Sequence, residues 1–323
     1  MTANVPVFPR QLVFATNFSE ACHSAIPLVA QWVDALQARL TLLHVHARGE
    51  QATAQRALHS FFAEAANYPG CERVLLSGDP ARGIAAFCRE HPQALLVMPP
   101  SSRRFLPRPL HVSLRTRVLR DVVTPMMTLP YTDAIPEPPQ PGGHVACWLT
   151  GRERRLDHLR EAAAIARRRG AELHLFYALP EISEGLMMEA MTAPRPFAAS
   201  AATRWLDHIV DHLGDDLTIR LQLATGSAAQ VLQKLLRRSR ANILVADRDA
   251  TIHSRLLRAS LSSAGASRYL LICVPPRDDE GFDPMLPPGP TPTLRLPTLP
   301  RFARPPRVAR SSGHDASLRL LFA

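Results

Sequence analysis

The same order of apolar runs and amphipathic segments occurs twice in this chain of 323 residues. The first pass opens with the apolar run 11–16, continues with apolar residues at helical spacing over 21–37, and reaches a second apolar run at 40–45. Short strands without an exposed polar face, joined by a helix, predict a parallel pair with a right-handed crossover. The pattern therefore favours an α/β fold.

The rhythm runs on to residue 129 and restarts at residue 144. In the first pass we expect further helices near 51–66, 80–90 and 114–121 and strands at 72–77, 94–98 and 126–129. In the second pass we expect strands at 144–149, 171–178, 217–224, 243–246 and 269–274 and helices at 154–169, 205–213, 228–238 and 260–267. Two copies of one unit are the simplest explanation. Each copy is predicted to be a doubly wound domain with a parallel five-stranded sheet and helices on both faces.

Changes in composition give the predicted domain boundaries. The first domain is expected over 8–131 and the second over 144–276, separated by a proline- and glycine-rich linker at 132–143. Residues 277–323 are rich in proline and arginine, a composition that buries too little apolar surface to fold alone. We predict that this tail is disordered.

Composition also limits the functional classes. The five cysteines form no C-x-x-C pair, which favours reduced thiols over a disulfide framework or a zinc ribbon. No stretch approaches the ~20 apolar residues that span a bilayer, so we expect a cytoplasmic protein without membrane contact. The formal charge of +10 attracts nucleic acid only non-specifically, and several arginines lie in the tail, so no nucleic-acid partner is predicted.

Several segments together resemble the universal stress protein family, an adenine-nucleotide-binding fold of the adenine nucleotide alpha hydrolase type. They are 12–20, 40–45, Gly78-Asp79-Pro80, 95–98 and 113–125 in the first copy, and 171–175, Gly226-Ser227 and 243–246 in the second. The resemblance covers nearly all of residues 10–276. It implies that the two domains pair through their last strands, 126–129 and 269–274, and that homo-oligomers are possible.

In nucleotide-binding members of that family, a loop G-x2-G-x9-G-[S/T] after the fourth strand wraps the phosphates, and an aspartate after the first strand helps to hold the nucleoside. Glycines let backbone N–H groups approach an anion without a Cβ in the way. The resemblance places the first copy's nucleotide positions at Asn17, Val45, Pro99, Ser102, Val112 and Ser113. Pro99 has no N–H to donate, and the aspartate is replaced by an asparagine.

The second copy departs from the pattern in the same way. Its corresponding positions are Thr150, Asp247, Ala250, Ala259 and Ser260. Carboxylates at residues 247 and 249 would repel phosphates. Both sites are therefore predicted to be degenerate, with no cofactor; ATP is possible but disfavoured.

Three other features have alternative interpretations. His208 and His212 are spaced to share a helical face and bind zinc, although a solvated face explains them better. The methionine-rich segment 186–191 is either an adaptable binding surface or a core cap. His44 and His46 lie on one side of a strand, where packing is favoured over catalysis.

The leading functional prediction is a non-enzymatic stress-response or regulatory protein that acts through contacts with an unidentified protein partner. The first alternative is an adenine-nucleotide sensor that uses Arg103, Arg104 and Arg108 of the first loop to bind the anion. A second alternative is an ATP-hydrolysing or nucleotide-transferring enzyme, for which the loops offer no support.

Overall fold

The computed structural model describes residues 9–68, 70–99, 113–129, 143–151, 155–179, 195–214, 216–254, 257 and 269–276, with side chains omitted for 195–201. All of these residues belong to one compact unit. Residues 132–142 of the predicted linker, the methionine-rich segment, the arginines of the first loop and the tail 277–323 lie outside the described residues.

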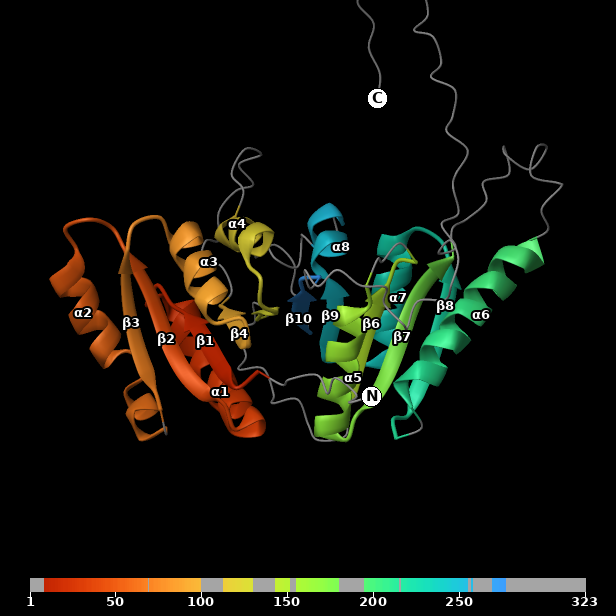
Figure 1. Cartoon of the computed structure of the whole chain (residues 1–323), viewed down its shortest axis with the longest axis horizontal. Helices are drawn as coiled ribbons and strands as arrows, with labels where there is room; N and C mark the ends of the chain where they lie inside the picture. The colour runs from red at the N-terminus through yellow and green to blue at the C-terminus, as the bar shows by residue number, and fades with distance from the viewer. Residues whose placement is uncertain are drawn as a thin grey trace, which may run out of the picture. The chain divides into compact units, whose positions relative to one another are not determined.

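Within the described part of the chain, ten strands form one sheet in the order β3-β2-β1-β4-β5-β10-β9-β6-β7-β8 (Figure 1). The first five are β1 Gln11–Ala15, β2 Arg39–His46, β3 Glu72–Ser77, β4 Ala94–Met98 and β5 Met126–Thr128. The second five are β6 His144–Leu149, β7 Glu172–Leu179, β8 Ile219–Thr225, β9 Ile243–Asp247 and β10 Leu270–Val274. All pairs within each set of five are parallel. The expected doubly wound α/β fold is confirmed, and we call β1–β5 with their helices the first half and β6–β10 with theirs the second half.

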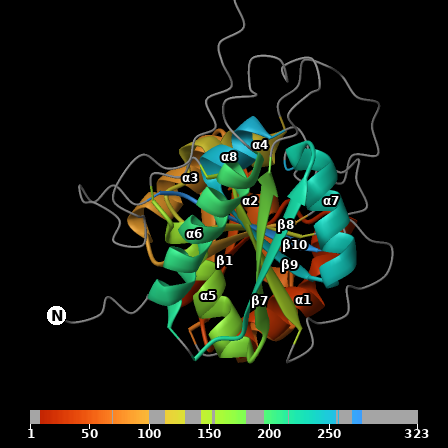
Figure 2. The same ribbon diagram turned by 90° about the vertical axis from the view of Figure 1, so that its right-hand side faces the viewer.

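Helices cover both faces of the sheet. The first half contains α1 Glu20–Leu36, α2 Gln51–Ser60, a 3-10 helix at Ala63–Asn67, α3 Pro80–Glu90 and α4 Leu114–Asp121. The second half contains α5 Asp157–Arg169, α6 Arg195–Leu213, α7 Ala228–Ser239 and α8 Arg248–His253. Side chains of α1, α2, α5 and α6 enter one apolar core, and those of α3, α4 and α7 enter the other. Figure 2 shows α6 and α7 on opposite sides of β7 and β8.

The two halves join through their last strands. β5 and β10 are antiparallel, with Met127 opposite Ile272 in the register. An antiparallel pair between two equivalent strands is what a pseudo-twofold arrangement requires. The predicted pairing of 126–129 with 269–274 is therefore present.

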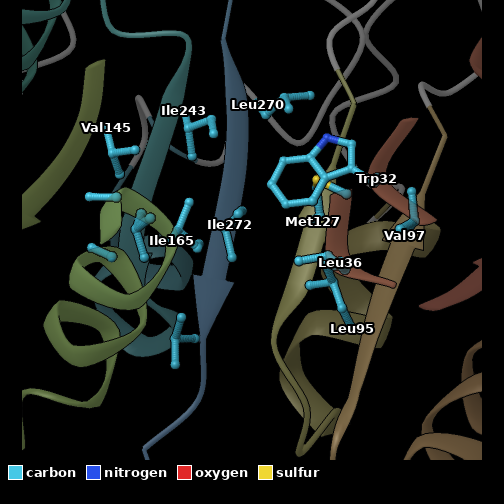
Figure 3. Close-up of a cluster of buried hydrophobic side chains, with 14 of the residues drawn as sticks. Trp32, Leu36, Leu95, Val97, Met127, Val145, Ile165, Ile243, Leu270 and Ile272 are labelled. Carbon is cyan, nitrogen blue, oxygen red and sulfur yellow. The ribbon is translucent and has the colours of Figure 1, made fainter. Parts of the chain in front are cut away.

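Both cores continue across this junction. On the face covered by α1 and α5, Trp32 and Met127 of the first half belong to the same buried cluster as Ile165 and Ile272 of the second half (Figure 3). The other cluster likewise contains residues from both halves. Because both halves share this buried apolar surface, we expect their stabilities to be coupled.

Arginines add polar contacts between the halves. Near the end of α5, Arg168 donates hydrogen bonds to the carbonyls of Ala35 and Leu36, at 3.3 and 3.4 Å. The guanidinium of Arg169 lies 6.0 Å from the ring centroid of Trp32, within the range of a cation–π contact. Capping one helix's carbonyls from another fixes how α1 and α5 meet.

The start of α6, at Arg195, lies ten residues before the expected helical segment 205–213. Two other elements also differ from the sequence prediction. The helix expected over 51–66 ends at Ser60, because Phe61 and Phe62 turn into the core. Arg73 of β3 donates to the carbonyls of Leu58 and Phe62, at 3.1 and 3.2 Å, and so caps the helix end. The second difference is α8, a helix that the sequence prediction did not contain; the one expected over 260–267 lies outside the described residues.

The cysteine and membrane predictions can be compared with the described residues. All five cysteines are free, and all but Cys71 are buried. Burial raises the pKa of Cys88 to about 11 and that of Cys273 to about 12, so both thiols stay protonated at neutral pH. Among the described residues, no helix combines the length and apolar character needed to cross a bilayer.

Candidate functional site

The predicted nucleotide positions of the first half meet at the carboxyl edge of its sheet. Asn17 follows β1 and Pro99 follows β4, and these two strands are hydrogen-bonded neighbours. In an open α/β sheet, ligands bind outside the carboxyl ends of the strands. The fold therefore brings the expected residues to the expected edge.

The side chain of Asn17 is engaged by its own loop. Its Oδ1 accepts hydrogen bonds from the Ser19 amide at 3.2 Å and from the Cys22 thiol at 3.0 Å. This Asx turn stabilises the start of α1, whose N-cap residue, Ser19, makes no side-chain cap of its own. Asn17 thus acts as a structural residue of the β1–α1 turn.

Pro99 is held by a buried guanidinium that the sequence prediction missed. Arg115, on the first turn of α4, is 4% exposed and donates from both Nε and Nη2 to the Pro99 carbonyl, with the Nε–O distance at 2.8 Å. Desolvation lowers the pKa of Arg115 to about 10, so it remains charged at neutral pH. Ser113 caps α4 by accepting from the Thr116 amide at 3.2 Å. At the start of α4, where the resemblance implies a bound phosphate, side chains of this chain therefore make the hydrogen bonds instead.

Aromatic rings pack beside the Asn17 turn. Phe18 adopts a left-handed backbone with φ 59°, and its ring centroid lies 4.3 Å from that of His44 and 5.6 Å from that of Phe61. His44 Nδ1 donates to the Thr16 carbonyl at 2.8 Å. The packing interpretation of His44 is consistent with these contacts, and the space next to the nucleoside position is filled by side chains of this chain.

Val45 lies away from this cluster. A Cβ built on Gly83 of α3 would come 3.2 Å from one Val45 methyl group, so Val45 packs closely beneath that helix. Its side chain therefore belongs to the face covered by α3, opposite to that of His44.

In the second half, Asp247 begins a helix directly at the end of β9. Its Oδ1 accepts from the Ala250 amide at 2.9 Å, and its carbonyl accepts from the buried Thr251 hydroxyl at 2.8 Å. The resulting α8 contacts α4 of the first half, and Arg248 donates to the Val122 carbonyl at 3.3 Å. The segment where the resemblance implied a phosphate loop thus begins with a helix capped by a carboxylate.

Thr150, which follows β6, precedes a glycine with no room for a side chain. Gly151 has φ +69°, and a Cβ built there would lie 2.7 Å from the Tyr177 hydroxyl oxygen. The Tyr177 ring is in turn 5.6 Å from that of Trp205. Aromatic rings therefore pack next to the expected nucleotide position after β6, as they do next to the one after β1 in the first half.

Four of the expected nucleotide positions, Ser102, Val112, Ala259 and Ser260, lie outside the described residues. A cavity of about 1070 Å³ lies at the other edge of the first half, lined by residues at the starts of β1, β2, β3 and β4, among them Arg10, Arg39, Glu72 and His91. Its position at the amino ends of the strands separates it from the nucleotide positions.

His208 and His212 belong to no group of three or more potential metal ligands among the described residues. His212 Nδ1 donates to the His208 carbonyl at 2.8 Å, a contact within the helix. The three side chains that the described structure does bring together for an ion are His144, Glu172 and His174.

Comparisons with solved structures support the fold. A universal stress protein from Archaeoglobus fulgidus DSM 4304 superposes with a TM-score of 0.61 at 13% identity, covering 86% of this chain and 100% of that one. A functionally unknown protein from Pseudomonas aeruginosa PAO1 gives 0.51 at 16% identity, covering 85% and 95%. A putative universal stress protein from Pseudomonas aeruginosa UCBPP-PA14 gives 0.50 at 16% identity, covering 84% and 94%. At these identities the likeness concerns the fold.

Scans against protein-family models and against the curated proteins return no match.

Proposed function

We propose that this chain is a non-enzymatic stress-response or regulatory protein that acts through protein contacts, with nucleotide sites that have been converted to structural use. The stress-protein assignment is supported by the likeness to solved universal stress proteins over both halves. The loss of nucleotide binding is supported by the chemistry of the carboxyl edges.

The observation that carries the proposal is the start of α8. Asp247 stands where the resemblance implies the first loop glycine, and its carboxylate caps a helix that packs on the other half. A phosphate at this point would meet a carboxylate at short range, where like charges repel strongly. It would also compete for the Ala250 amide that the carboxylate already holds.

The first half supports the same conclusion by a different route. Its Pro99 supplies no N–H, and the Pro99 carbonyl is bound by the buried Arg115. A nucleotide would have to displace this contact and the ring packing of Phe18 on His44. Both changes oppose binding.

The second candidate function is an adenine-nucleotide sensor based in the first half. One observation favours it: Arg115 places a charged, buried guanidinium beside the start of α4, a position suited to an anion. Binding of this kind would depend on arginines, namely Arg115 together with the predicted Arg103, Arg104 and Arg108 of the first loop, rather than on loop glycines.

Calorimetry of the full chain with ATP, ADP and AMP at up to millimolar concentration tests both functions. We expect no binding heat and no turnover of labelled ATP. Binding of any of these nucleotides would support the sensor instead. Its loss in Arg115→Met would assign the anion contact to Arg115, and its retention there would leave Arg103, Arg104 and Arg108 as the binding residues. The protein-contact role is tested by co-purification with and without residues 277–323.

A further inference from the structure

A cluster of potential metal ligands lies at the amino ends of β6 and β7, whereas the expected nucleotide positions lie at the carboxyl ends of the strands. His144 begins β6 and pairs in register with Glu172 of β7, and His174 follows two residues later on the same face. Their ligand atoms all lie within 4.8 Å of one another. We propose that His144, Glu172 and His174 form a binding site for a divalent transition-metal ion, with zinc as the best match.

The distances suit a tetrahedral ion. Glu172 Oε2 lies 3.6 Å from His144 Nδ1 and 3.3 Å from His174 Nε2. Ligands about 2.0–2.2 Å from a tetrahedral zinc ion are roughly 3.4 Å apart, so two edges of the tetrahedron are nearly in place. Two imidazoles and one carboxylate, with a fourth position open to water, are a common zinc ligand set.

One ligand atom lacks a hydrogen bond in the described structure. His144 Nδ1 is buried from solvent and has no hydrogen-bond partner there, although it faces the Glu172 carboxylate. A buried polar atom without a hydrogen bond destabilises the folded state. A metal ion at this point would satisfy it.

Gln222 supplies the outer contact that a metal-bound histidine needs. Its amide nitrogen lies 2.8 Å from His174 Nδ1. When Nε2 binds a metal, Nδ1 carries the proton, and the rotated amide presents its oxygen as the acceptor. The same side chain can therefore orient His174 with and without an ion.

Arg220 is the competitor for the site. It donates to both carboxylate oxygens of Glu172, at 2.7 and 3.0 Å. Its side chain is 61% exposed, so it can withdraw from Oε2 into water while an ion takes that oxygen. Its positive charge should weaken metal binding, so the proposal predicts that removing this charge makes zinc bind more tightly.

The first half provides an internal comparison. The register places Gln11, Arg39 and Thr41 where the second half has His144, Glu172 and His174. There the amide of Gln11 donates to the Thr41 hydroxyl at 2.8 Å, and an arginine replaces the carboxylate. The same position in the first half therefore lacks the nitrogen and carboxylate ligands.

Zinc titration of the full chain by calorimetry, after removal of metal with a chelator, tests the site. We expect one zinc ion whose affinity falls at least tenfold in His174→Gln and in His144→Gln, the latter at a partly exposed position that tolerates change. The matched control, His208→Gln with His212→Gln, removes two histidines from α6 and should stay within twofold of the wild type. Arg220→Gln should bind zinc several-fold more tightly.

Circular dichroism establishes that each variant remains folded. Zinc bound elsewhere in the chain would be unchanged by the His144 and His174 substitutions and so does not obscure their effect. Equal zinc affinity and stoichiometry in the wild type and the folded His144→Gln variant would overturn the proposal, as would the absence of zinc binding at 100 µM by the wild type. The proposal is independent of the nucleotide question, since no nucleotide enters this experiment.

Discussion

Met127 on β5 is the position that best tests whether the two halves unfold together. It is fully buried, and its register partner Ile272 on β10 is 1% exposed. Replacing a buried methionine by alanine removes apolar contacts and leaves a cavity, at a cost of about 2–5 kcal/mol. With about 3 kcal/mol as the central value, Met127→Ala should increase the unfolding constant roughly 150-fold.

Because the apolar clusters cross the β5–β10 junction, this loss should be felt in both halves. Hydrogen exchange of the most protected amides of β1 and β6, followed by mass spectrometry under conditions that report opening equilibria, measures it. We expect protection to fall by the same factor in both strands. Met127→Leu, which conserves volume, is the control and should cost less than about 1.5 kcal/mol. A fall confined to β1, with β6 unchanged, would refute the coupling.

Two further predictions concern local geometry and pH. Gly151→Ala should lower the free energy of unfolding by about 1–3 kcal/mol in urea titrations, because φ is +69° and the new Cβ would meet the Tyr177 hydroxyl. The control is Gly170→Ala, at φ +58° with open space around the Cβ, which should cost less. Equal losses of stability in the two variants would rule out the clash with Tyr177. The hydrogen bond from Arg117 holds the pKa of Asp79 below its usual value, so its stabilising effect is present above the unfolded-state pKa and is lost as pH falls through the folded-state pKa. Acid titration of unfolding should therefore show Asp79→Asn less stable than the wild type at pH 7 and the difference shrinking below about pH 4, whereas a constant difference would contradict this linkage.

The strands were the most predictable part of the fold. In a parallel sheet covered on both faces, each strand is a short apolar run without alternation, and turn residues mark its ends. The predicted strands at 72–77, 94–98 and 144–149 have the bounds found in the structure. The pairing of the last strands between the halves is implied by the resemblance to the universal stress protein family and does not follow from the apolar pattern alone.

Helix ends set by distant residues were not predictable in the same way. The periodic pattern continues past Ser60, but Arg73 of β3, thirteen residues further along the chain, donates hydrogen bonds to the carbonyls at the helix end. For α8, the sequence does contain a helix-start signal, namely an aspartate at the N-cap with Asp249 in the first turn. The resemblance, however, points to Asp247 only as a source of repulsion for phosphate.

The metal cluster shows a further limit of linear spacing. Glu172 and His174 are two residues apart and share a face by strand geometry, but His144 joins them only because β6 lies beside β7 in one register. A shift of one residue would turn His144 to the opposite face. Aligning the internal repeat, however, places the three potential ligands at the positions that Gln11, Arg39 and Thr41 occupy in the first half. None of these three first-half residues is a typical zinc ligand, so the difference stands out.

That comparison indicates where two similar halves can differ in function. The carboxyl edges of the two halves are alike, because aromatic packing and internal hydrogen bonds occupy both of them. Their amino edges differ in charge order: arginine on β2 and glutamate on β3 in the first half, glutamate on β7 and arginine on β8 in the second. Edge residues of this kind contribute little to the shared core, so they can change without disturbing the ten-stranded sheet. The chemistry that distinguishes one half from the other is therefore expected at the amino ends of the strands.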